Sequence, residues 1–169
     1  QTCALPIYLV PRLGDLFLSK NAEGRMRGLE FLRGLAVRHK DAAAEFLRDE
    51  LLAQGVEKVV LTDVPRADVA EVIEDAFRYD RMVLMASSYD AGVFPPMETF
   101  LYHLAAKQYR KRKGAGVQNG TWAPSAAKTM QKILEPLQNI EYVGDVITIK
   151  TTMSEANKAE LKALAELLK

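Results

Sequence analysis

The run from Met82 to Ala86 most strongly limits what this chain can fold into. Its residues, MVLMA, are apolar without alternation, which is typical of a strand buried on both faces of a parallel sheet. Small, hydroxyl-bearing and aromatic residues follow, and Pro95 and Pro96 then open an amphipathic stretch through Leu104. This order predicts a strand, an exposed loop and a helix that begins at proline.

The same alternation extends from Asp41 to the carboxyl end. We expect helices at about 41–54, 65–77, 95–104, 124–137 and 154–168, and strands at about 59–61, 82–86, 114–117 and 142–149. One more strand is needed before the first helix, and Phe31 to Val37 is the only candidate. Short βα connections predict an α/β, flavodoxin-like three-layer sandwich. In this fold we expect a five-stranded parallel sheet with the strand order 2-1-3-4-5, in which the first strand is degraded.

Residues 1–40 do not share this regularity. Gln1 to Ile7, QTCALPI, resembles a translated sequencing-library adapter, so we expect the true amino terminus to be missing. Residues 8–40 scatter Arg and Gly at neither helical nor strand spacing. A weak helix over Met26 to Leu35 and a segment read out of frame to about residue 40 are both open interpretations. We therefore divide the chain into an aberrant segment, 1–40, and one flavodoxin-like domain, 41–169.

Composition excludes several classes of function. Lys and Arg number 23 against 22 Asp and Glu, which predicts no nucleic-acid partner. The apolar runs are too short to cross a bilayer, so we expect no membrane association and a cytoplasmic location. With Cys3 as the only cysteine and His39 and His103 as the only histidines, we expect no metal site. The basic run Lys107 to Lys113 is either a solvated helix end or a docking site for an acidic electron donor.

Two polar segments follow neighbouring strands of the predicted sheet. The first contains Ser87, Ser88, Tyr89, Asp90, Ala91 and Gly92, and the second contains Gln118, Asn119, Gly120, Thr121 and Trp122. Because ligands of open α/β sheets bind outside the carboxyl ends of the strands, the two segments predict a site for a planar, hydrogen-bonding ligand. Alternatively, the first is a surface turn in which Gly92 supplies positive φ, and Trp122 is a lid on the core.

The motifs SSYDAGVFPPMETFLYHL at 87–104 and QNGTWAPSAAKTM at 118–130 resemble the flavin-binding domain of flavodiiron proteins, also called A-type flavoproteins. The resemblance runs from about Asp41 to the carboxyl end and implies a truncated, FMN-binding domain. In that family the domain follows a metallo-β-lactamase-like domain whose diiron centre reduces oxygen or nitric oxide. Carried over by position, Ser87 to Gly92 and Asn119 to Trp122 would surround the isoalloxazine ring.

The phosphate loop of that family is not matched. Its hydroxyl-rich and glycine-rich cradle at a helix amino terminus holds the FMN phosphate. This chain has Val37, Arg38, His39, Lys40 and Asp41 at that place. Cations such as His39 could attract a phosphate, but without glycine the backbone cannot wrap it closely.

The resemblance implies an electron-transfer module of a flavodiiron oxidoreductase. It would receive electrons from a rubredoxin-like donor or a reductase and pass them to the diiron centre of the missing domain, across a homodimer of the full-length protein. The fragment itself would hold no complete active site. Two alternatives stay open: a free-standing flavodoxin or quinone-reductase-like protein, and a relic that binds no FMN and serves as an interaction domain.

Overall fold

The computed structural model describes residues 4–9, 42–121, 123–150 and 152–169. Residues 42–53 are helical. The other helices are α2 (Val69–Arg78), α3 (Pro95–Ala106), α4 (Ala126–Leu134) and α5 (Glu155–Leu168). The strands are β1 (Ala4–Leu9), β2 (Lys58–Asp63), β3 (Arg81–Tyr89), β4 (Gly92–Val93), β5 (Arg112–Asn119), β6 (Ile140–Tyr142) and β7 (Ile147–Ile149).

The strands form one sheet in the order β2-β1-β3-β5-β6. All of these neighbours are parallel, β7 pairs in parallel with β5 beyond β6, and β4 turns back antiparallel on β3. When the hairpin strand β4 is left out and β6 and β7 are counted as one interrupted strand, the order along the chain is 2-1-3-4-5. The predicted flavodoxin-like α/β sandwich is therefore confirmed.

The first strand is not where the sequence placed it. β1 (Ala4–Leu9) pairs with β2 along its whole length and with β3 from Ile7 to Leu9. The prediction that Phe31 to Val37 supplies this strand is wrong, and those residues lie outside the described part of the chain. β1 instead overlaps the segment interpreted as adapter-like. Pro6 can lie in this strand because its position faces Val60 of β2 and lies before the stretch aligned with β3.

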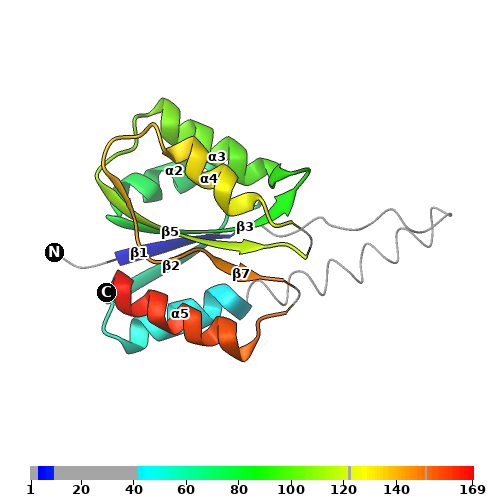
Figure 1. The fold of residues 1–169 in the computed structure, drawn as a ribbon. Coiled ribbons are helices and arrows are strands. Elements are labelled where there is room, and N and C mark those ends of the chain that lie inside the picture. Colours follow the sequence, from blue (N-terminus) through cyan, green and yellow to red (C-terminus); the bar gives the residue numbers. More distant parts are fainter. Residues whose placement is uncertain (1–3, 10–41, 122, 151) are drawn as a thin grey trace.

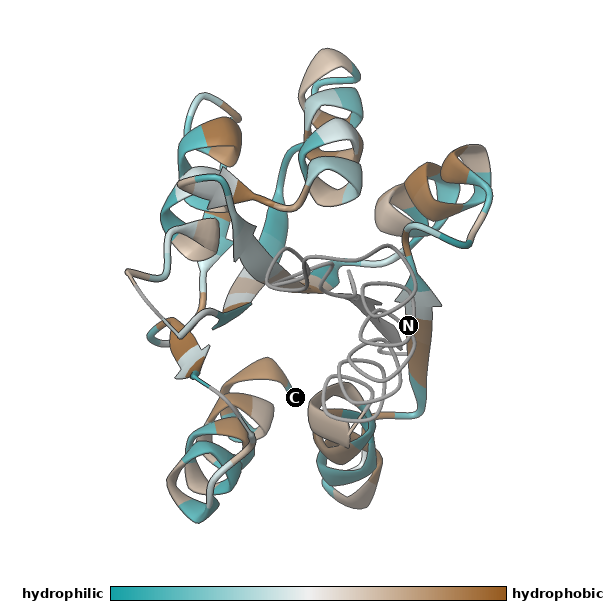
Figure 2. Ribbon diagram, turned by 90° about the vertical axis from the view of Figure 1, so that its right-hand side faces the viewer, coloured by the Kyte–Doolittle hydropathy of each residue, from teal (hydrophilic) through white to brown (hydrophobic). Residues whose placement is uncertain are grey.

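Helices cover both faces of the sheet (Figures 1 and 2). α2, α3 and α4 pack on one face, where Met82, Leu84 and Ala86 of β3 join their core. The helix at residues 42–53 and α5 pack on the other face, against Val83 and Met85. Alternate side chains of β3 thus enter opposite cores, which is why this strand is a continuous apolar run.

Local capping explains three of the helix starts. Asp68 accepts a hydrogen bond from the backbone N–H of Ala70 at the start of α2, and Ser154 forms a capping box with Asn157 at the start of α5. Pro95 occupies the first turn of α3. The final predicted strand, Tyr142 to Ile149, is in fact two strands, because residues 143–146 with Gly144 at φ +69° separate β6 from β7.

Candidate functional site

The first polar segment is a strand end with a tight hairpin that is exposed at its tip, rather than an irregular loop. β3 continues through Tyr89, the chain turns at Asp90 and Ala91, and β4 returns, with Tyr89 opposite Gly92. Asp90 and Ala91 both have positive φ, +46° and +57°, as a two-residue turn of type I′ requires. The hairpin therefore carries backbone strain at the carboxyl end of a central strand, a common property of ligand sites.

We predict that Ala91→Gly stabilises the protein. Alanine pays a steric cost of about 1 kcal/mol in the left-handed region that glycine avoids, although glycine also gains entropy in the unfolded chain. The expected gain in unfolding free energy is about 0.5 kcal/mol, measured by urea denaturation. Ala159→Gly is the matched control, because exposed Ala159 lies within the right-handed helix α5, where glycine should lower stability by about 0.5–1 kcal/mol. An equal effect of both substitutions would contradict the turn geometry.

Of the two glycines of the site, only Gly120 lies at a close approach, and neither forms a turn through positive φ. Neither Gly92 nor Gly120 has positive φ, so the alternative in which Gly92 supplies it is wrong. A Cβ on Gly120 would lie 3.0 Å from the Ser88 Oγ and 3.1 Å from the Pro124 Cβ, so a larger residue there would have to push the two segments slightly apart. A Cβ on Gly92 would meet only the Tyr89 carbonyl oxygen, at an ordinary 3.5 Å. That side of Gly92 is open to a ligand.

The Ser88 hydroxyl joins the two segments. Its Oγ accepts hydrogen bonds from the backbone N–H of Ser125 at 2.8 Å and of Ala126 at 3.2 Å. Ser125 in turn donates its hydroxyl to the carbonyl oxygen of Gly92 at 2.8 Å. Since α4 has no cap from its own N-cap side chain, a residue from β3 satisfies these helix-start donors. The hairpin and the start of α4 are thus fixed to each other.

The second segment is anchored to the last strand. Gln118 is buried, accepts from the backbone N–H of Ala127 and donates to the Thr148 hydroxyl, each at 3.0 Å. The Asn119 side-chain amide donates to the carbonyl oxygen of Ile149 at 2.9 Å, and Thr121 donates its hydroxyl to that of Lys150 at 3.2 Å. These bonds leave little freedom to a segment that directly adjoins β3, where Asn119 is in register with Ser87.

Two groups in the first segment have unused binding capacity. Ser87 is 1% exposed, and its hydroxyl has no hydrogen-bond partner in the described structure. Tyr89 is 47% exposed, and Phe94 supports its ring edge-on with centroids 5.9 Å apart. A buried unpaired hydroxyl and a supported, accessible ring are what a planar polar ligand needs. The residues present therefore fit the ring of a flavin.

Other predicted site residues lie outside the described part of the chain. They are Trp122 and, in the suggested phosphate loop, Val37, Arg38, His39, Lys40 and Asp41. The described neighbour Thr121 is exposed, and Gly120 touches Ser88. Ser87 to Gly92 and Asn119 to Thr121 are thus brought to one edge of the sheet, while the roles of Trp122 and His39 stay predictions.

The basic run lies at the other end of β5. Arg112 begins this strand and Asn119 ends it, so seven residue steps of about 3.3 Å separate the run from the site by roughly 23 Å. Arg112 is structural, because it donates to the backbone carbonyl oxygens of Tyr79 and Phe77 at the end of α2, at 2.8 Å each. This geometry favours the helix-end interpretation over donor docking at this run.

Ionisable groups elsewhere in the described part of the chain form no metal centre. His103 is exposed in the last turn of α3, where a cation complements the helix dipole. Among the residues that the structure describes, no group of three or more His, Cys, Asp or Glu side chains could hold a metal ion.

No described helix is long and apolar enough to cross a membrane.

Sequence reasoning assigned no role in the site to three residues that build it. Gln118 and Ser125 carry the hydrogen bonds around α4, and Phe94 supports Tyr89. A buried polar residue at the end of an apolar strand could have drawn attention to Gln118. The sequence indicated only that Ser125 lies at a helix start. The residue that accepts its hydroxyl hydrogen bond, Gly92, is far away in the sequence.

Solved structures share this fold. The rubredoxin oxygen:oxidoreductase of Desulfovibrio gigas superposes with a TM-score of 0.76 at 11% identity, over 99% of this chain and 35% of that one. The flavodiiron protein of Giardia intestinalis superposes with a TM-score of 0.74 at 15% identity, over 99% of this chain and 36% of that one. A flavodoxin from Streptococcus pneumoniae TIGR4 superposes with a TM-score of 0.69 at 14% identity, over 98% of this chain and 97% of that one.

These likenesses establish a flavodoxin-like fold. This chain spans about a third of the length of the two flavodiiron chains and nearly all of the flavodoxin. No family model and no curated protein matches the sequence.

Proposed function

We propose that this chain is an FMN-binding electron-transfer module that belongs to a flavodiiron oxidoreductase. The observation that carries the proposal is the junction of β3 and β5, where the Ser88 hydroxyl, Gly120 and the start of α4 join two polar segments into one rigid edge. Ligands of open α/β sheets bind at such edges. The shared fold with two flavodiiron chains supports the same assignment.

The residues of this edge would have distinct tasks. Tyr89 offers an aromatic face to the flavin ring, the Ser87 hydroxyl offers a hydrogen bond to its polar edge, and the open side of Gly92 lets the ring approach the backbone closely. Ser88, Gln118 and Ser125 position these groups without needing to touch the flavin. Bound FMN would accept and release electrons, and the protein would orient it and tune its electronics. No side chain here needs to act as an acid, base or nucleophile.

Purified protein tests this proposal directly. Titration of FMN with the full chain should quench flavin fluorescence to saturation at one FMN per chain. A preparation that neither carries flavin nor quenches added FMN would overturn the proposal and favour the relic. The diiron domain and the electron donor are the partners that the module would require, with electrons entering from a rubredoxin-like protein or a reductase.

We predict that Trp122→Ala weakens FMN binding. The chain's only tryptophan follows β5 in the second segment and would supply an aromatic wall for the flavin. Loss of such a contact is worth roughly 1 kcal/mol, or about a fivefold rise in Kd. The Tyr102→Ala change on the outer surface of α3 is the control, since Tyr102 is 58% exposed and distant in the chain from either segment. Equal Kd values for Trp122→Ala and the parent would show that Trp122 only packs.

A free-standing flavodoxin is the second candidate, because the chain matches nearly the full length of the S. pneumoniae flavodoxin. The nearly balanced charge argues against it, since a free electron carrier that docks basic partners benefits from a strongly acidic surface. Sequencing the coding DNA upstream of Asp41 separates the candidates. A metallo-β-lactamase-like region there supports the flavodiiron module, and its absence from the same gene supports the flavodoxin.

A further inference from the structure

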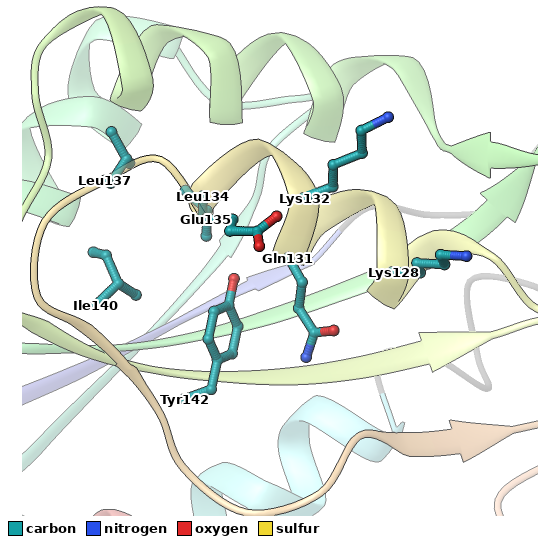
Figure 3. A pocket seen from close by; sticks show the side chains of 8 residues that line it. All are labelled: Lys128, Gln131, Lys132, Leu134, Glu135, Leu137, Ile140 and Tyr142. Carbon is teal, nitrogen blue, oxygen red and sulfur yellow. The ribbon is translucent and has the colours of Figure 1, made fainter.

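A hollow lies between α4 and β6 at the end of the sheet, and none of the residues assigned to the flavin edge lines it (Figure 3). Its volume is about 590 Å³, within the roughly 300–1,000 Å³ of typical small-molecule sites. α3 packs against α4, whereas β6 is the last strand in the sheet order, so this part of α4 overhangs a sheet edge. Leu134, Leu137 and Ile140 give the hollow an apolar lining.

Cations dominate the rim of this hollow. Lys128 and Lys132 lie one helical turn apart on α4, both exposed, and neither forms an ion pair with any residue that the structure describes. Their flexible stems let both ammonium groups turn toward a ligand. Glu135 is the one acidic residue of the lining, and it lies at the carboxyl end of α4, away from Lys128. The Lys128 end of the hollow therefore favours a negative charge.

Tyr142 adds an unsatisfied hydrogen-bonding group. Its side chain lines the hollow, and its hydroxyl, directed toward α4 in Figure 3, is shielded from solvent without a partner in the described structure. Burial raises the pKa of Tyr142 to about 12, so the hydroxyl keeps its proton at neutral pH and is available as a donor. A buried hydroxyl without an acceptor destabilises the folded protein. A ligand acceptor is one way to supply the missing bond.

We propose that the hollow between α4 and β6 binds an aromatic anion, a carboxylate or sulfonate on a ring system. The ring would lie against Ile140 and Leu137, and the anionic group would lie toward Lys128 and Lys132. The hollow favours an anion because the positive charges of Lys128 and Lys132 outnumber the single negative charge of Glu135. The site uses no residue of the β3 and β5 edge, so it stands independently of the proposed flavin function.

The test uses the full chain and 1-anilinonaphthalene-8-sulfonate, an aromatic anion whose fluorescence rises in apolar surroundings. The dye is titrated with and without excess FMN. We expect one saturable dye site that FMN does not compete for. Lys132→Gln should raise the dye Kd about threefold and Glu135→Gln should lower it about threefold, from the typical size of exposed charge interactions. Lys162→Gln on α5, which removes one charge elsewhere, should change nothing.

Competition by FMN would place the dye at the flavin edge and overturn the proposal. The same conclusion would follow if Lys132→Gln and Lys162→Gln had equal effects, or if Glu135→Gln did not tighten binding. A chain that fails to bind FMN but shows the expected dye pattern would keep this site and remove the flavin function. Circular dichroism of each variant confirms that the fold is retained, so that a change in Kd reports the site.

Discussion

Ser88→Ala should lower the unfolding free energy by about 2 kcal/mol and weaken FMN binding at the same time. The Ser88 hydroxyl accepts two backbone hydrogen bonds from the start of α4, from Ser125 and Ala126. Alanine leaves both donors without a partner, and loss of a helix-capping oxygen costs about 0.5–2 kcal/mol. We expect the high end of that range because one oxygen serves two donors. Urea denaturation gives the stability, and fluorescence titration gives the FMN affinity.

Ser87→Ala is the matched control, one residue earlier on the same strand. The Ser87 hydroxyl is buried without a partner, so its removal should leave stability unchanged or slightly higher. If that hydroxyl binds the flavin, Ser87→Ala weakens FMN binding without destabilising the fold. A stability loss at Ser87 as large as at Ser88 would contradict the hydrogen-bond assignment. Together the two variants separate a group that contacts the ligand from one that positions the site.

Arg112→Ala should have the largest effect on stability, a loss of about 3 kcal/mol. The guanidinium donates to the backbone carbonyl oxygens of Phe77 and Tyr79, and more weakly to those of Arg110 and Lys111. It also lies 5.7 Å from the centre of the Tyr109 ring. Hydrogen bonds to charged groups contribute about 1.5–3 kcal/mol each, and their loss exposes helix-end carbonyls at a packed junction.

Arg110→Ala provides the comparison for Arg112. Arg110 is exposed and its side chain has no hydrogen bond or ion pair to the described residues, so the substitution should change stability by less than about 0.5 kcal/mol. Arg112→Lys should recover only part of the loss, because an ammonium group lacks the planar fork that reaches several carbonyls. Similar losses for Arg110→Ala and Arg112→Ala would mean that only the net charge of the basic run matters.

Local signals in the sequence predicted most of the fold correctly. Asp68, Pro95 and Ser154 each marked a helix start, and the buried run at Met82 marked the central strand. These signals suffice to locate helix starts and buried strands, because both depend on residues that are close together in the sequence. The parallel order of the strands followed from the alternation of elements.

Long-range pairing is what the sequence did not reveal. β1 was missed because residues 1–7 resemble a translated adapter, and only the pairing of Ala4–Leu9 with β2 and of Ile7–Leu9 with β3 shows a strand there. The hairpin at Asp90 and Ala91 was read as an open loop, since type I′ turns normally carry glycine where this chain has alanine. The cap that Ser88 provides to α4 spans 37 residues in the sequence to Ser125, beyond any local pattern.

The most direct test of the central claim is to map FMN binding onto the chain by amide chemical shifts. The ¹⁵N-labelled protein is titrated with FMN, and the shift changes are assigned residue by residue. We expect the largest changes at Ser87 to Gly92 and Asn119 to Thr121, the two segments at the carboxyl ends of β3 and β5. Saturated binding with its largest changes elsewhere, for example along α5, or no change at all, would contradict a flavin site at this edge.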